Sequence, residues 1–260
     1  MTTNRKKSLS MNATRKVETV RLNRYLAMLG VASRRACDEI ILSGRVRVDG
    51  RQLKELGTTV VPGVSRIFLD NHPLDHPPRP LVLILNKPTG VVSTVSDPEG
   101  RRTVIDFCGK YARSRRLFPV GRLDFNTTGA ILLTNDGMLC YRLTHPRFQI
   151  PRIYHARVRG VMNERKLKKL ASFAAPPRDV QRSKPPVELV KELDRESLIT
   201  ITLYEGRNRQ VWKMCERVGL RVVKLKRVSF GPVSIRNLPL GAIRPLEVRE
   251  LDRLNRIIGD

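Results

Sequence analysis

Apolar positions along the chain change their spacing near residue 80. Between residues 20 and 44 they fall at helical intervals and predict two short helices, with Gly30 closing the first and Ser33 as the N-cap of the second. After residue 80 most apolar residues form short continuous or alternating runs, which predict strands joined by tight turns. Because strands outnumber helices there, the pattern predicts an α+β fold with a mixed, mainly antiparallel sheet.

The same pattern divides the chain into segments. Residues 1–19 are basic and poor in apolar side chains, which predicts a disordered arm or an artefact of the start site. Residues 20–71 predict a small α/β module, in which short strands follow the two helices. Residues 72–80 contain four prolines and predict a linker, and residues 81–260 predict the larger domain.

The larger domain is expected to open with a central strand at 81–85 that breaks at Asn86. Its later strands are expected at 130–134, 153–161, 187–193, 198–204 and 222–228, and its helices at 103–108, 138–145, 163–174 and 209–218. Residues 246–258 are interpreted as a polar end of the chain. No repeat of fixed period appears, which favours one domain over an array.

Charge adds the strongest global constraint. The chain carries 50 Lys and Arg residues against 24 Asp and Glu, a net charge of +26. Such an excess repels itself unless a polyanion is present, and phosphate neutralisation with counterion release favours nucleic acid as that polyanion. An anionic membrane fits less well because no basic amphipathic helix stands out, and a merely solvated basic surface is the plainest alternative.

The cysteines and the apolar runs limit the cellular compartments in which the protein can be expected. The four cysteines are scattered and fit neither a disulfide framework nor a zinc site, and the four histidines add no metal signature. We therefore expect no metal and a reducing, cytoplasmic location. No apolar run is long enough to span a bilayer, and the N-terminus lacks the apolar core of a secretory signal, which leaves an organellar transit peptide as an open alternative.

One polar loop carries candidate chemistry. Residues 121–129 are bounded by glycines, lead into the apolar run 130–134 and place Asp124 beside Arg122. An Asp close to an Arg is held in its ionised form, and a carboxylate fixed at the start of a strand suits nucleophilic work. The plain alternative is an Asp that caps a turn or pairs with its neighbour, because such ion pairs are also common at purely structural positions.

Two further features lie C-terminal to this loop. Tyr154 lies on the alternating run 153–161, where it either packs in the core or stacks on a nucleobase. The polar loop 205–210 precedes a helix that carries Lys213, and a Gly-Arg loop at such a position can hold a phosphate or a carboxylate. Eight basic residues against two glutamates occur between positions 205 and 227, which fits either a solvated face or contacts to an RNA backbone.

The small module also carries cations in a pattern. Arg34 and Arg35 lie in the first turn of the second expected helix, where the helix dipole disfavours positive charge and an anionic ligand would compensate. Arg45 and Arg47 alternate with valines along a short strand and so share one face. Both arrangements favour a surface that binds RNA.

Three segments of this module, 22–26, 33–35 and 44–50, resemble the small S-four-like RNA-binding domain shared by a ribosomal small-subunit protein, some tRNA synthetases and several RNA-modifying enzymes. The resemblance adds Arg24, within the first segment, to the four cations above. It implies that these five arginines contact RNA.

The larger domain carries a second resemblance. Gly-Arg-Leu-Asp at 121–124, followed by Leu-Leu-Thr-Asn-Asp-Gly at 132–137, resembles the signature of pseudouridine synthases that act on ribosomal RNA. Segments 85–90, 205–211 and 225–228 are similar to further motifs of that family, and the likeness extends over about residues 20 to 250. The Asn208-Arg209-Gln210 version of the last motif is most similar to the large-subunit branch.

The resemblance implies a role for each matching residue. Asp124 would be the catalytic aspartate, Arg122 would help to hold the flipped-out site, and Tyr154 would stack on the target base. The implied substrate-binding residues are Arg122, Arg209, Lys213 and Leu225. At one position the chain departs from the family: a basic residue that can pair with the aspartate usually follows Gln210-Val211, whereas this chain has Trp212. Either Lys213 or Arg209 supplies that charge, or the register differs.

The implied reaction isomerises a uridine of ribosomal RNA and needs neither metal nor nucleotide, because it is redox-neutral. It also implies a monomer that binds ribosomal RNA, needs no cofactor and makes no membrane contact. Other functions stay open: a small-subunit rRNA synthase, a non-catalytic ribosome-binding or assembly protein, and an RNA glycosidase. A glycosidase normally needs a carboxylate pair, which Asp124 and a residue such as Glu205 would have to form.

Overall fold

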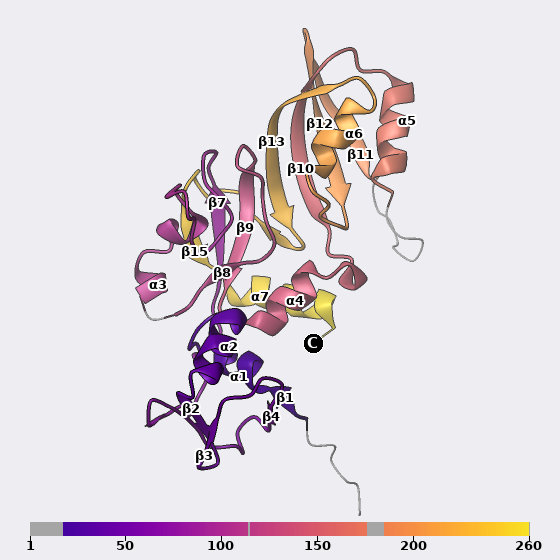
Figure 1. The fold of residues 1–260 in the computed structure, drawn as a ribbon. Helices are drawn as coiled ribbons and strands as arrows, with labels where there is room; N and C mark the ends of the chain where they lie inside the picture. Colours follow the sequence, from indigo (N-terminus) through magenta and orange to yellow (C-terminus); the bar gives the residue numbers. More distant parts are fainter. Residues whose placement is uncertain (1–17, 114, 176–184, 260) are drawn as a thin grey trace, which may run out of the picture. The chain divides into compact units, whose positions relative to one another are not determined.

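The computed structural model describes residues 18–113, 115–175 and 185–259 (Figure 1). Two compact units divide the chain, residues 1–77 and residues 78–260. Nearly all of the expected basic arm, residues 1–17, lies outside the described residues. None of the described helices combines the length and the apolarity needed to cross a membrane.

The first unit packs two helices on short strands around a core that includes Leu26 and Ile41, both almost fully buried. The Ser33 hydroxyl accepts the Ala36 N–H at 3.1 Å, so the expected N-cap is confirmed. The elements are α1 (Leu22–Met28), α2 (Arg34–Leu42), β1 (Val20–Arg21) paired with β4 (Thr59–Val60), and a sheet in the order β3 (Arg51–Leu53), β2 (Val46–Val48), β5 (Ile67–Leu69) and β6 (His72–Pro73).

The strand β6 corrects one expectation from sequence. Residues 72 and 73 belong to the sheet of the first unit, not to a linker, because His72 pairs with Leu69 in the β5–β6 ladder. Asp70 and Asn71 both have positive φ, 50° and 66°, which is the backbone of a tight two-residue hairpin. Pro73 is tolerated because β6 is an edge strand.

The second unit is built on one sheet, which contains nine strands within the described residues. Its main path runs β11 (Val187–Leu193), β12 (Glu196–Leu203), β10 (Arg152–Arg159), β13 (Arg221–Phe230), β9 (Thr128–Thr134), β7 (Val82–Lys87) and β15 (Ile243–Pro245), with β8 (Phe118–Pro119) on β9 and β14 (Val233–Ser234) on β13. Only β9 and β13 pair in parallel among these strands, so the mixed, mainly antiparallel sheet predicted from sequence is confirmed.

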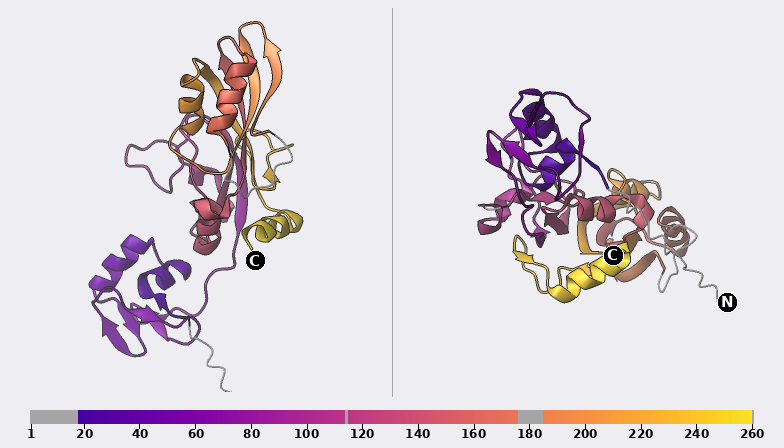
Figure 2. Two further views of the ribbon diagram at one scale, coloured as in Figure 1. Left: turned by 90° about the vertical axis from the view of Figure 1, so that its right-hand side faces the viewer. Right: turned by 90° about the horizontal axis from the view of Figure 1, so that it is seen from below.

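Alternating apolar residues give this sheet two buried faces. In β7, Leu83 and Leu85 pack into one hydrophobic cluster, whereas Val82 and Ile84 pack into the other. Helices α5 (Glu164–Phe173) and α6 (Gln210–Glu216) cover the first cluster, and α4 (Gly137–Thr144) and α7 (Val248–Ile258) cover the second (Figures 1 and 2). The remaining helical segments are η1 (Val104–Phe107), α3 (Lys110–Arg113) and η2 (Pro146–Phe148).

Two expectations for this unit were wrong. The strand expected at 81–85 continues to Lys87, which pairs with Gly129 of β9. The segment 246–258, interpreted as a polar end, instead contains helix α7, whose Leu254 and Ile258 are buried. By contrast, the Asn163 side chain accepts the Lys166 N–H and caps α5 as predicted.

Candidate active site

A cavity of about 640 Å³ opens in the second unit. It brings together most of the site residues expected there from sequence, namely Arg122, Asp124, Tyr154, Arg209 and Leu225. The cavity lies at the junction of β9 and β13, where Thr128 and Gly129 pair with Lys226 and Arg227. Asp124 and Arg227, which are 103 positions apart in sequence, therefore line one cavity.

Backbone hydrogen bonds fix the loop on the N-terminal side of Asp124. The buried Ser93 hydroxyl donates to the Leu123 carbonyl at 2.9 Å and accepts the Leu123 N–H at 3.1 Å. The Asp124 carbonyl accepts the Thr127 N–H at 3.0 Å, which closes a turn over Phe125 and Asn126. Ser93 thus satisfies both backbone groups of the residue before Asp124.

A buried lysine fixes the other side of the same loop. The Phe125 carbonyl accepts the Gly90 N–H at 3.0 Å and lies 3.4 Å from the Lys87 ammonium. That ammonium also donates to the carbonyls of Pro88 at 3.0 Å and Val91 at 2.9 Å. Lys87 is fully buried, so these backbone oxygens, and not water, solvate its charge.

The buried Lys87 interacts electrostatically with Asp124. Burial lowers the pKa of Lys87 to about 8, and the negative charge of Asp124 opposes that shift while the positive charge of Arg227 adds to it. The ion pair with the neighbouring Arg122, which was the plain alternative for Asp124, does not form, and no other ion pair to Asp124 occurs among the described residues. The half-buried Asp124 carboxylate is thus not engaged in a structural salt bridge.

Two buried arginines form another wall of the cavity. Arg227 donates from Nε to the Ala130 carbonyl at 2.7 Å and from Nη1 to the Tyr154 hydroxyl at 3.5 Å. Arg152 donates to the Leu143 carbonyl at 3.3 Å, and both guanidinium groups lie 5.1 Å from the centre of the Phe230 ring. Burial first, and then the charge of Arg227, holds the pKa of Arg152 below its ordinary value.

Sequence reasoning did not single out either arginine for the site. One guanidinium nitrogen of each, Nη1 of Arg152 and Nη2 of Arg227, is buried without a hydrogen-bond partner among the described residues. Such donors are costly when unpaired, and both arginines add positive charge to the cavity that Asp124 also lines. Tyr154, which is 8 % exposed, is packed in the core, as one interpretation of this residue expected, and it also lines the cavity.

The residues considered from sequence as partners of Asp124 do not all line the cavity. Lys213 is exposed on α6 and does not line the cavity. Arg209 does line it, and its guanidinium lies 5.6 Å from the ring centre of Trp212. Glu205 also lines the cavity, but its carboxylate is bound by Arg207 at 2.9 Å and by Gln210 at 3.0 Å. It is therefore not a free second carboxylate.

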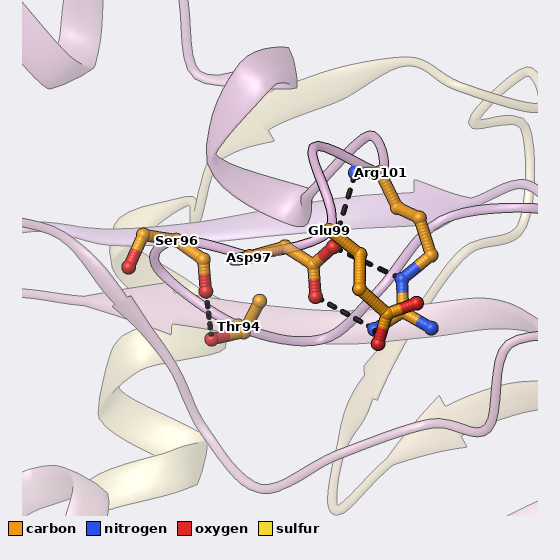
Figure 3. A network of polar contacts seen from close by, with 5 residues as sticks. All are labelled: Thr94, Ser96, Asp97, Glu99 and Arg101. Carbon is orange, nitrogen blue, oxygen red and sulfur yellow. Dashed lines mark hydrogen bonds and ion pairs between the residues drawn. The ribbon is translucent and has the colours of Figure 1, made fainter.

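The loop 93–102 contributes Arg101 to the cavity wall. Figure 3 shows Arg101 beside Asp97 and Glu99 of the same loop. Asp97 binds the Arg101 guanidinium through two hydrogen bonds of 2.8 and 3.0 Å, and Glu99 binds it at 2.9 Å. These contacts hold the pKa of Asp97 below its ordinary value, chiefly through the side-chain hydrogen bond from Arg101. Because two carboxylates neutralise its charge, we interpret Arg101 as a brace of the loop.

The cations expected to bind RNA in the first unit are not equivalent. Arg34 and Arg35 are exposed at the start of α2, whose first turn holds no acidic residue. Arg47 is exposed on β2 and Arg45 is exposed just before this strand, but Arg45 is bound by both carboxylate oxygens of Asp70. Arg47 donates to the Gly50 carbonyl at 3.1 Å, and Arg24 is partly buried.

Comparison with known proteins places this arrangement in a family. Residues 81–217 match the model of the RNA pseudouridylate synthase family, and residues 20–64 match the S4 domain. An uncharacterised RNA pseudouridine synthase of Aquifex aeolicus is 36 % identical, covering 92 % of this chain and 95 % of that protein. The ribosomal large subunit pseudouridine synthase B of Bacillus subtilis is 37 % identical, covering 91 % of this chain and 96 % of that protein.

The chain belongs to the RNA pseudouridine synthase family. A solved structure described as a pseudouridylate synthase superposes with a TM-score of 0.60 at 26 % identity, covering 90 % of this chain and 99 % of that one. This pseudouridine synthase is thus an isomerase that moves the uracil base within an RNA nucleotide, and it carries an S4 domain at its N-terminus.

Proposed function

We propose that this enzyme isomerises one uridine of ribosomal RNA, in the large subunit, with Asp124 as its catalytic carboxylate and without a cofactor. The observation that carries the proposal is that Asp124 lies in the same cavity as Tyr154 and two buried arginines and forms no salt bridge there among the described residues. The relatives of Bacillus subtilis and Pseudomonas aeruginosa, both named ribosomal large subunit pseudouridine synthase B, support the choice of subunit.

The reaction breaks the bond between ribose and the ring nitrogen of uracil, turns the base and rejoins it through ring carbon 5. Every atom and electron of the substrate is conserved, so a single carboxylate suffices where a glycosidase normally needs two. In this proposal Asp124 either attacks the nucleoside or assists departure of the base. The buried cation Lys87 interacts with the charge of Asp124, and the buried cation Arg227 lines the same cavity as Asp124.

The target base must first leave its helix, which costs a few kcal/mol and is easiest in a loop or mismatch. Tyr154 would stack on the extruded base, and Leu225, which is buried in the same wall, would support it. Arg122 and Arg209 line the open side and would hold the strand around it. Lys213, exposed outside the cavity, would contact the RNA backbone further away.

The first unit would supply further contacts to the RNA backbone through Arg24, Arg34, Arg35, Arg45 and Arg47. We infer that Arg34, Arg35 and Arg47 contribute most, because Asp70 already neutralises Arg45. We further propose that the enzyme acts as a monomer in the cytoplasm, the setting to which scattered cysteines and a ribosomal substrate both point.

An Asp124→Asn variant tests the proposal. The variant should bind RNA as the wild type does, yet leave one large-subunit uridine unmodified when it replaces the native protein in a deletion strain. Asp194→Asn, which changes an exposed carboxylate in the β11–β12 turn, is the matched control and should restore the modification. Persistent pseudouridine with Asp124→Asn would exclude Asp124 as the catalyst, a missing small-subunit site would reassign the substrate, and release of free uracil would indicate a glycosidase.

A further inference from the structure

A second cavity, of about 970 Å³, adjoins the active-site cavity. The two share Arg209, Trp212 and Leu225, so the second cavity continues the wall of the first. Its floor includes the buried side chains of Leu220, Val222 and Leu225. Among its described lining residues, only Arg209 and Leu225 have a role in the reaction proposed above.

The second cavity is strongly basic. Arg159, Arg209, Arg221 and Lys224 line it, against the single acidic residue Glu216. Arg159 is bound by Glu196 at 2.9 Å, but the other three cations form no ion pair with any described residue. Unpaired cations beside an apolar floor fit a ligand that is both anionic and flat-faced, as a nucleotide is.

Trp212 lies where the two cavities meet. Its indole N–H is buried and has no acceptor among the described residues. The Arg209 guanidinium, a planar cation, lies over the Trp212 ring, 5.6 Å from the ring centre. The face of this ring can thus contact a planar group. An unsatisfied donor and an aromatic face at one residue match the oxygen atoms and the flat surface of a nucleobase.

We propose that the second cavity binds a nucleotide next to the target uridine, with its base stacked on Trp212 and its phosphate against Arg221 and Lys224. This inference rests on the proposed function, because an RNA strand that delivers uridine to Asp124 must continue past the shared wall.

The chain contains one tryptophan, so its fluorescence reports on Trp212 in the unaltered enzyme. The probes are RNA hairpins with the target uridine and a single abasic site at each nearby position in turn. We expect the intact hairpin to quench the fluorescence, and one abasic position within two nucleotides of the uridine to abolish the quenching and weaken binding about 10-fold to 100-fold. Equal quenching by every abasic hairpin would overturn the proposal.

A double-mutant cycle checks the same contact. Trp212→Ala should weaken binding of the intact hairpin about as much as the decisive abasic site does, and combining the two changes should add little, because both remove one stacking contact. Trp212→Phe keeps a ring and should restore most of the binding, which separates stacking from misfolding. Full additivity of the two losses would refute the contact.

The cations are tested separately, because an acidic protein partner would also be drawn to them. Arg221→Ala with Lys224→Ala should weaken binding of the intact hairpin more than Lys191→Ala with Arg195→Ala, a pair of exposed cations at the edge of the sheet. Equal losses from the two pairs would remove the phosphate contact from the proposal. Asp124→Asn should still show the quenching, so a failure of the catalytic assignment is distinguishable from a failure of this one.

Discussion

Gly129 of β9 lies directly opposite Arg227 of β13, and a Cβ at position 129 would stand 2.1 Å from the Arg227 carbonyl oxygen. The glycine also has a φ of 111°, which residues with a side chain rarely adopt. This close approach of two backbones brings the loop that carries Asp124 to the strand that carries Arg227. The parallel pair thus requires glycine for both steric and conformational reasons.

Gly129→Ala is therefore expected to destabilise the second unit by about 2–4 kcal/mol, in the range of substitutions that create steric overlap in a core. Urea unfolding followed by circular dichroism measures the loss. Gly137→Ala is the matched control, because a Cβ at position 137 meets no atom within 4 Å and the residue begins helix α4. That control should be neutral or stabilising, and equal stability of both variants would contradict the argument.

Ser93 offers a test of how rigidly Asp124 must be held. Ser93→Ala leaves the Leu123 N–H and carbonyl without the partner that holds them, at a cost of about 1–3 kcal/mol in stability. Because the next residue is Asp124, we expect kcat for pseudouridine formation to fall about 10-fold or more while KM changes little. Initial rates measured over a range of RNA concentrations give the two quantities separately.

Thr94→Ala provides the comparison for Ser93→Ala. The Thr94 hydroxyl donates to the Ser96 carbonyl at 2.9 Å within the exposed part of the same loop (Figure 3). Its loss removes one hydrogen bond and leaves the Ser93–Leu123 contacts intact, so kcat should stay near that of the wild type. A similar loss of kcat in both variants would mean that loop flexibility, not the clamp on Leu123, matters.

Local patterns were enough to predict much of this architecture. The apolar run at 130–134 and the alternation after Tyr154 predict β9 and β10, because a buried strand and a half-buried strand differ in period. The caps at Ser33 and Asn163 are local as well, since each side chain binds a backbone N–H three residues later. Helix α7 was missed because its many charged residues made the segment look polar. Its apolar residues Leu251, Leu254 and Ile258 nevertheless keep helical spacing.

The site was predictable only in part, because burial of its cations is decided by distant segments. Lys87, Arg152 and Arg227 are basic residues that sequence patterns place on the surface, yet each is at least 94 % buried. Arg227 is held by the Ala130 carbonyl of another strand, a contact that no local spacing reveals. The one available signal was Gly129 inside an apolar strand, which indicates that another backbone approaches closely.

The pKa of Lys87 leads to a prediction about pH. Its folded-state pKa of about 8 lies below the ordinary 10.5, so between these values the unfolded chain binds more protons than the folded chain. The free energy of unfolding therefore rises by about 3 kcal/mol as the pH increases from about 8 to 10.5. Below pH 8 this gain is absent, because Lys87 is protonated in both states.

Lys87→Met removes this contribution and isolates it from other titrating groups. The difference in unfolding free energy between wild type and variant should grow in favour of the wild type by about 3 kcal/mol from pH 7.5 to 10.5. Lys191→Met, a change at an exposed lysine of β11, should give a difference that does not vary with pH. A flat difference for Lys87→Met, measured by urea unfolding under reducing conditions, would show that Lys87 keeps an ordinary pKa.

The salt dependence of RNA binding tests the first unit. Arg34 and Arg35 are exposed and unopposed by acidic residues in the first turn of α2. If each neutralises one phosphate, Arg34→Ala with Arg35→Ala should flatten the slope of log K against log salt concentration by about 1.4 to 1.8. Lys168→Ala with Lys169→Ala removes two adjacent exposed cations from helix α5 and should leave the slope nearly unchanged. Equal flattening by both pairs would indicate attraction by the overall charge of +26 rather than a defined footprint on the S4 domain.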